Sequence, residues 1–169
     1  MFAWVALAAC GGDDGEFDPS VPAIAYCEPV ADFTTTSLED EIAAIVNQRR
    51  AAGATCGGEV MPPVGPLTVA PALRCAARVH TLDMHTRGYF DHTNPDGESP
   101  WDRMERAGYT WSAAGENIAG GNTTAAATMD QWMNSPGHCR NIMNGDYVNL
   151  GVGHVAEGAL WTQVFGAPR

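Results

Sequence analysis

The stretch that decides the fold is Gly115-Glu116-Asn117-Ile118-Ala119-Gly120-Gly121. It places a single carboxylate, that of Glu116, among glycines and small apolar residues, and no Lys or Arg stands between Arg106 and Arg140. Glycines let backbone N–H groups come close to a carboxylate, which can then act as a buried, hydrogen-bonded strut. The same carboxylate could instead face a ligand. The sequence leaves both interpretations open and makes Glu116 the centre of the candidate site.

Helical patterns lie on both sides of this stretch. Capping residues, apolar residues spaced by three and four, and terminal glycines predict the helices. Alternation near the C-terminus predicts an antiparallel hairpin. Helices and strands are segregated along the chain, which is typical of the α+β class. The predicted helices cover residues 38–52, 71–87, 100–107 and 123–134. The predicted extended segments cover residues 109–118, 148–154 and 160–165. Residues 57–69 are predicted to form a loop, and residues 135–138 are predicted to break the helix before them.

Several short motifs follow one another in a fixed order between residues 38 and 168. Each is weak alone, but their order is specific, and together they resemble a bacterial CAP/SCP domain, of the superfamily of cysteine-rich secretory proteins, antigen 5 and pathogenesis-related-one proteins. The motifs are Ala77-x-x-His80-x-x-Asp83-Met84, Tyr89-Phe90-Asp91-His92-x-Asn94-Pro95-Asp96-Gly97, Gly115-Glu116-Asn117-Ile118-Ala119, Trp132-x-x-Ser135-Pro136-Gly137-His138-x-x-Asn141-Ile142, and Gly151-Val152-Gly153 with Trp161-Thr162-Gln163-Val164-Phe165-Gly166.

The resemblance implies a three-layer α–β–α sandwich with a central antiparallel sheet and a cleft. In animal and plant members the cleft carries two His and two Glu that can hold a divalent metal. The first His corresponds to His92 and the first Glu to Glu116. Ser135 replaces the second Glu, and Leu160 stands where the second His is expected, whereas the bacterial branch places a His at the position of His138. The residues expected to line the cleft are His92, Glu116, Asn117, Ser135 and His138.

Two chemical interpretations of this set stay open. His92, His138 and Glu116 could bind a divalent metal such as Zn²⁺ and leave a fourth position free for water. They could also form a hydrogen-bonded cluster that fixes three loops. The metal interpretation would allow a metal-assisted hydrolase acting on peptide or ester bonds.

The other polar candidates are expected to be structural. Ser135 with His138 could be drawn as part of a hydrolase triad, but no glycine elbow surrounds Ser135, so a hydrogen-bonding role in the loop is the better interpretation. His80 is expected to pack within its helix, and His85 and His154 are expected at the surface.

Binding without turnover is the favoured function. The resemblance implies either a lipid or sterol in an apolar crevice, or an envelope or extracellular protein partner on the cleft surface. The net charge is −11, all nine basic residues are Arg, and nine of the twenty acidic residues lie within the first 41 positions. Nothing here forms the basic patch that nucleic acid requires, so we expect no nucleic-acid partner. We expect a monomer.

The N-terminal residues predict export. Residues 1–10 are a short apolar run ending in Ala8-Ala9-Cys10 before Gly11, which resembles a bacterial lipobox in which Cys10 is lipidated. Residues 11–36 are predicted to form an acidic tether and a lead-in to the domain. Within this segment, residues 21–30 could lie against the domain. Residues 37–169 are predicted to form the CAP/SCP domain. The expected location is the cell envelope, as a lipoprotein, or the exterior, with membrane contact only through the lipid anchor.

If Cys10 carries the lipid, four cysteines are left, Cys27, Cys56, Cys75 and Cys139. An even number in an exported chain predicts disulfide bonds rather than a Zn²⁺ site, since no CxxC pair is present. Three pairings are possible from sequence. We favour Cys56–Cys75 with Cys27–Cys139, because Cys56 follows one predicted helix and Cys75 begins the next.

Overall fold

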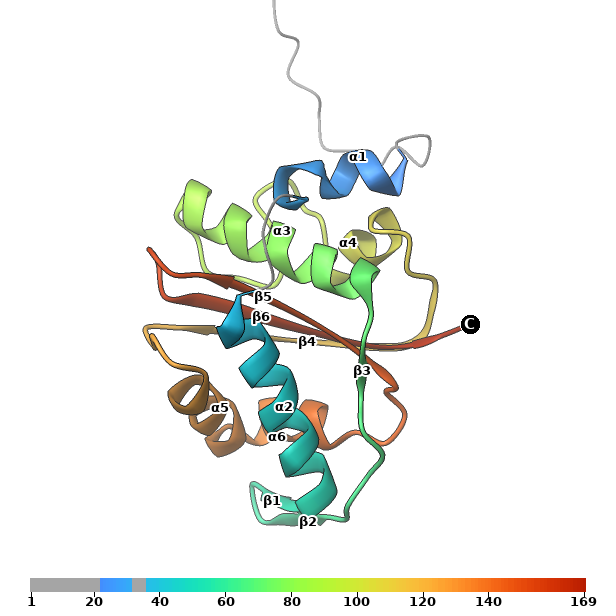
Figure 1. Cartoon of the computed structure of the whole chain (residues 1–169), viewed down its shortest axis with the longest axis vertical. Helices are drawn as coiled ribbons and strands as arrows, with labels where there is room; N and C mark the ends of the chain where they lie inside the picture. The colour runs from blue at the N-terminus through green and yellow to red at the C-terminus, as the bar shows by residue number, and fades with distance from the viewer. Residues whose placement is uncertain (1–21, 32–35) are drawn as a thin grey trace, which may run out of the picture.

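The computed structural model describes residues 22–31 and 36–169 (Figure 1). The predicted export segment with Cys10, and most of the predicted tether, lie outside the described residues. The elements are α1 (Ala23–Cys27), η1 (Glu28–Val30), α2 (Ser37–Ala52), β1 (Ala54–Cys56), β2 (Glu59–Met61), β3 (Thr68–Val69), α3 (Pro71–Arg87), α4 (Pro100–Arg106), β4 (Trp111–Gly120), α5 (Ala125–Asn134), α6 (Pro136–Met143), β5 (Asn149–Val155) and β6 (Leu160–Pro168).

The central sheet has the strand order β3-β5-β6-β4. β5 and β6 form the predicted antiparallel hairpin, β6 pairs antiparallel with β4, and the two-residue strand β3 adds a parallel edge beside β5. Helices α3 and α4 cover one face of the sheet, with α1 packed on the outer side of α3, and α2, α5 and α6 cover the other face (Figure 1). The prediction of an α+β, three-layer α–β–α sandwich is therefore confirmed.

Local signals set the ends of the helices. Thr36 and Glu39 form a reciprocal capping box at the start of α2, and Ser99 and Asp102 do the same for α4. Helix α3 has Pro at its first turn and ends at Gly88, which adopts the left-handed conformation with φ of 70°. The helices predicted at 38–52 and 71–87 are confirmed within one residue.

Helix α3 rests directly on β5 because β5 carries glycines beneath it. A Cβ atom on Gly151 would lie 2.0 Å from the carbonyl carbon of Leu73, and one on Gly153 would lie 2.5 Å from the carbonyl oxygen of Ala77. Any side chain at these positions would push the helix off the sheet. The Gly151-Val152-Gly153 motif is thus a requirement of packing between two backbones.

Two local predictions need correction. The Ser135-Pro136 segment does end α5, but the chain then enters another helix, α6, because Pro is well suited to the first turn of a helix. The predicted loop at 57–69 contains the short strands β2 and β3, and β2 forms a separate two-stranded sheet with β1. The expectation that residues 21–30 could lie against the domain is confirmed for residues 23–30, which form α1 and η1 and pack against α3 through the buried Tyr26 and Val30.

The four cysteines form two disulfides, but the favoured pairing is wrong. Cys27 is bonded to Cys75, with 5.7 Å between their Cα atoms, and Cys56 is bonded to Cys139, with 5.4 Å. Helices α2 and α3 are neighbours in sequence but lie on opposite faces of the sheet (Figure 1). Each disulfide therefore joins segments that share one face.

The contact between α3 and β5 can be tested with Gly151→Ala. We expect this change to lower the free energy of unfolding by about 2–3 kcal/mol, because the new methyl group meets helix backbone that has no room to move. Gly137→Ala in α6 is the matched control, since a Cβ there meets nothing within 4 Å and Ala favours a helix. Urea unfolding followed by circular dichroism measures both. An unchanged midpoint for Gly151→Ala would contradict the packing.

Candidate functional site

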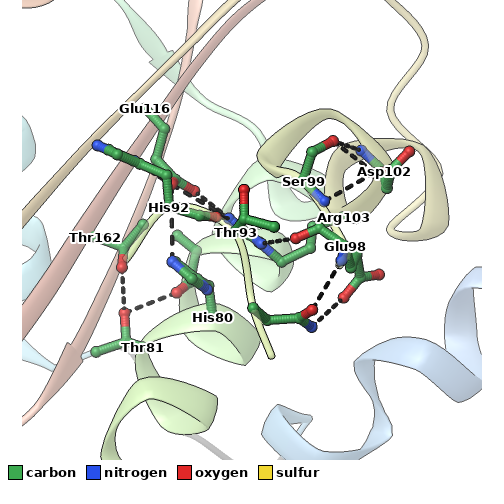
Figure 2. A network of polar contacts seen from close by, with 12 residues as sticks. His80, Thr81, His92, Thr93, Glu98, Ser99, Asp102, Arg103, Glu116 and Thr162 are labelled. Carbon is green, nitrogen blue, oxygen red and sulfur yellow. Dashed lines mark hydrogen bonds and ion pairs between the residues drawn. The ribbon is translucent and has the colours of Figure 1, made fainter. Parts of the chain in front are cut away.

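The candidate site is built around the buried carboxylate of Glu116, in the middle of β4. β4 pairs with β6 along its length, and the backbone of Glu116 lies opposite Val164. The Nη2 atom of Arg103 donates to Oε2 of Glu116 at 2.9 Å and to Oε1 at 3.2 Å. Nδ1 of His92 lies 2.8 Å from Oε1. Both carboxylate oxygens are therefore engaged by side chains of the protein (Figure 2).

Arg103 comes from α4 and is 1% exposed. Its guanidinium also donates to the backbone carbonyl oxygens of His92, at 2.8 Å, and Glu98, at 3.0 Å. These two carbonyls belong to the loop between α3 and α4. A single guanidinium thus neutralises Glu116 and holds the loop that carries His92 (Figure 2).

His92 is the partner of Glu116 that reaches solvent, with 47% of its side chain exposed. Both oxygens of Glu116 accept hydrogen bonds from Arg103, so in the contact with His92 the carboxylate is again the acceptor and Nδ1 of His92 is the donor. The hydrogen bond to Glu116 raises the pKa of His92 above its usual value, although burial opposes the effect. When His92 is charged, its remaining Nε2–H is a donor directed away from Glu116.

His80 lies behind the carboxylate on α3 and is completely buried. Its Nε2 atom is 3.8 Å from Oε1 of Glu116, and its Nδ1 atom is 3.4 Å from the hydroxyl of Tyr89. Burial lowers the pKa of His80 to about 4, so this imidazole is neutral at ordinary pH. The prediction that His80 packs within its helix is confirmed, and the same imidazole lies against Glu116.

The other predicted cleft residues lie on or beside α6. Asn117 is fully buried and donates to the carbonyl of His138 at 3.2 Å, so it ties α6 to β4. His138 is half-buried, and both burial and the neighbouring His92 lower its pKa. Ser135 makes no side-chain hydrogen bond with any described residue, and its carbonyl accepts from Cys139. Within the described part of the chain, the structure brings His92 and Glu116 into direct contact but joins neither Ser135 nor His138 to Glu116 by a hydrogen bond.

A recess of about 300 Å³ opens beside this cluster. Four segments meet there, namely the loop with His92, the start of α4 with Trp101, the middle of β4, and α6 with Asn141. Trp101 is 39% exposed, and its ring centroid lies 5.8 Å from that of Trp111, which supports it. The recess therefore offers an imidazole and an amide beside an aromatic wall.

The donor groups present do not fit a Zn²⁺ site. Zn²⁺ needs three or four ligand atoms with free lone pairs, and both oxygens of Glu116 already accept from a positive guanidinium. That guanidinium would repel a metal ion at the same oxygens. Among residues 22–31 and 36–169, no group of three or more His, Cys, Asp or Glu side chains is placed to hold a metal ion.

Comparison with known families agrees with this arrangement. The family described as the cysteine-rich secretory protein family, or CAP, matches residues 44–165. The chain belongs to the CAP family. Among solved structures, an extracellular SCP-domain protein from Bacillus anthracis str. Ames matches this CAP domain with a TM-score of 0.66 and 28% identity, over 76% of this chain and 39% of that protein. An outer surface protein from Borrelia burgdorferi shares the fold at 18% identity, with a TM-score of 0.62 over 78% of this chain and 90% of that one.

Two curated relatives come from Bacillus subtilis (strain 168). The uncharacterized protein YkwD is 37% identical over 132 residues, which is 78% of this chain and 51% of YkwD. The uncharacterized membrane protein YlbC is 39% identical over 86 residues, which is 51% of this chain and 24% of YlbC. This CAP protein thus spans about half of YkwD and a quarter of YlbC. In the described part of the chain, none of the helices has the length and apolar character that crossing a membrane requires.

Sequence reasoning missed Arg103, Trp101 and Asn141 as parts of the site. One indirect signal could have found Arg103. A buried carboxylate needs a nearby cation, and the short helix just before β4 carries Arg103 and Arg106. Sequence does not choose between them, and in the structure Arg106 pairs with Glu98 instead.

The pairing of His92 with Glu116 predicts its titration. We expect Glu116→Gln to lower the pKa of His92, because an amide keeps the shape of the carboxylate but loses its charge. Asp91→Asn is the control. It should lower the pKa of His92 less than Glu116→Gln does, because Asp91 acts on His92 only through its charge and more weakly than Glu116. Titration by nuclear magnetic resonance measures both variants, and His80 should stay neutral between about pH 5.5 and 8.

The sign of the effect on stability follows from the same shift. The folded pKa of His92 is raised, so its stabilising contribution is complete below the unfolded pKa of about 6.5. It is lost as the pH rises through the folded pKa. A His92 pKa that does not change in Glu116→Gln would contradict the assigned contact.

Proposed function

We propose that this CAP domain is exported and acts by binding a ligand in the recess between His92 and Trp101, without turnover. The observation that supports the proposal is that the carboxylate oxygens of Glu116 already accept hydrogen bonds from Arg103 and His92. A carboxylate held in this way is poorly suited to act as a general base or a metal ligand. It is well suited to orient His92 toward the recess.

The ligand we propose carries an anionic or hydrogen-bond-accepting group beside a flat or apolar group. The first would accept from Nε2–H of His92, and the second would lie on the exposed face of Trp101. The walls also present Asn141 and the edge of Glu116, and a volume of about 300 Å³ is small. We therefore favour a group on an envelope or extracellular partner over a lipid or sterol, because an acyl chain or a sterol ring system needs a longer channel.

Binding of a carboxylate should depend on pH through His92. Benzoate serves as a probe, because it joins one carboxylate to a flat ring. We expect its affinity to be up to about fivefold higher at about pH 5.5 than at pH 8, because His92 loses its charge as the pH rises through its raised pKa. Benzyl alcohol, which has the ring without the charge, should show no such dependence. Chemical shifts of His92 and Trp101 measure both affinities.

Matched variants separate the recess from the rest of the surface. His92→Gln should abolish the pH dependence, and Trp101→Ala should weaken both probes. His85→Gln and Phe90→Ala change an exposed imidazole and an exposed aromatic ring elsewhere and should have no effect. Equal benzoate affinity at both pH values would overturn the proposal. Micromolar Zn²⁺ binding by calorimetry, lost in both His92→Ala and His138→Ala, would favour the metal-assisted hydrolase instead.

Export and lipid anchoring belong to the same proposal. Two disulfides within one small domain suit an oxidising compartment outside the cytoplasm, and the Bacillus anthracis protein of similar structure is described as extracellular. We expect labelled palmitate to be incorporated into the full chain and to be lost in Cys10→Ser, because the thiol of Cys10 is the proposed attachment point. Label that persists in Cys10→Ser would show that Cys10 is not the anchor.

A further inference from the structure

A second cavity, of about 480 Å³, lies away from the recess and shares none of its lining residues. It is bounded by the start of α2, the end of α3, and the end of β5 with the turn that follows. Its apolar wall is formed by Leu38, Leu82, Val155 and Ala156. A cavity of this size with a largely apolar wall and a few polar groups is typical of a small-molecule site.

His154 is the central polar group of this cavity. The sequence placed it at the surface, but it is only 7% exposed and stacks on Trp161, with 3.9 Å between ring centroids. The prediction was wrong because α2 and α3 cover the end of β5. Neither ring nitrogen makes a hydrogen bond with any residue in the described ranges, and the ring lines the cavity, so its nitrogens are left for a ligand. Burial lowers the pKa of His154, and the neutral ring offers one donor and one acceptor.

The charges around His154 select the ligand. Glu157 lines the cavity and makes no ion pair with a described residue, and the carboxylates of Glu39 and Glu157 both act on His154 as negative charges. The start of a helix can attract anions, but here the capping box of Thr36 and Glu39 occupies that end of α2, and Glu39 also pairs with Arg78. Because Glu39 is paired with Arg78, the carboxylate that faces the cavity is that of Glu157, and it favours a cationic ligand.

We propose that this cavity binds an aliphatic amine. The alkyl chain would lie against Leu38, Leu82 and Val155, and the ammonium group would donate to the acceptor nitrogen of His154 and pair with Glu157. A protonated amine supplies three donors and a compact positive charge, which these two acceptors match. The amine could belong to a free small molecule or to a lysine side chain of a partner.

Three probes with the same chain length test the head group on the full chain. We expect n-hexylamine to bind about two- to fivefold more tightly than 1-hexanol, and hexanoate to bind most weakly. The readouts are the chemical shifts of the His154 ring and of the neighbouring Trp161 indole N–H. Nα-acetyl-lysine methylamide distinguishes the two sources, because tighter binding than n-hexylamine assigns the site to a lysine and weaker binding assigns it to a free amine.

Three variants attribute the preference to named groups. His154→Phe keeps the stacking on Trp161 and removes both ring nitrogens, and Glu157→Gln keeps the size and removes the charge. Each should abolish most of the preference for the amine over the alcohol, and Glu105→Gln, which changes an exposed carboxylate on α4, should not. Equal affinity for amine and alcohol in the native chain would overturn the proposal. So would an amine preference that survives in both His154→Phe and Glu157→Gln.

Discussion

The carboxylate of Glu116 brings a negative charge into the interior, and its compensation by Arg103 sets the geometry of the cleft. A buried charge without a partner is strongly unfavourable, so β4 and α4 must meet with these two side chains in register. The same guanidinium donates hydrogen bonds to the backbone carbonyls of His92 and Glu98. These bonds hold the loop between α3 and α4 against the site. The position of His92, and hence the group offered to a ligand, therefore follows from one ion pair (Figure 2).

Arginine has the same loop-closing role elsewhere in the molecule. The sequence contains no Lys, and Arg50, Arg78 and Arg103 are all buried. Arg50 donates to the backbone carbonyls of Gly65, Ile142, Asn144 and Tyr147, and it thereby joins two distant loops at the end of α2. A planar guanidinium reaches several acceptors at fixed angles, whereas an ammonium group on a flexible chain does not. Arg50 and Arg103 thus supply the hydrogen bonds that regular secondary structure would otherwise give to these loop carbonyls.

Local sequence signals predicted the helices and strands well. The predictions that failed concerned which parts of the chain meet in space. Caps and glycines predicted helices at 38–52 and 71–87, which agree within one residue with the structure, and the ordered motifs predicted that His92 and Glu116 share one site. The disulfide pairing failed because it depends on which face of the sheet each helix covers, and adjacency in sequence carries no such information. Arg103 was missed because its partner is chosen by the packing of α4. His154 was misplaced because the exposure of a strand end depends on the helices that cover it.

The disulfide between Cys27 and Cys75 also determines how the molecule would respond to a mechanical pull. The bond closes a covalent loop over a separation of 48 residues that contains the whole of α2. Tension applied from the N-terminal side would enter at Cys27 and cross directly to α3, because that path is far shorter than the polypeptide around the loop. Helix α2 and the small sheet of β1 and β2 would carry no force. The pull would be resisted instead where α3 rests on Gly151 and Gly153 of β5.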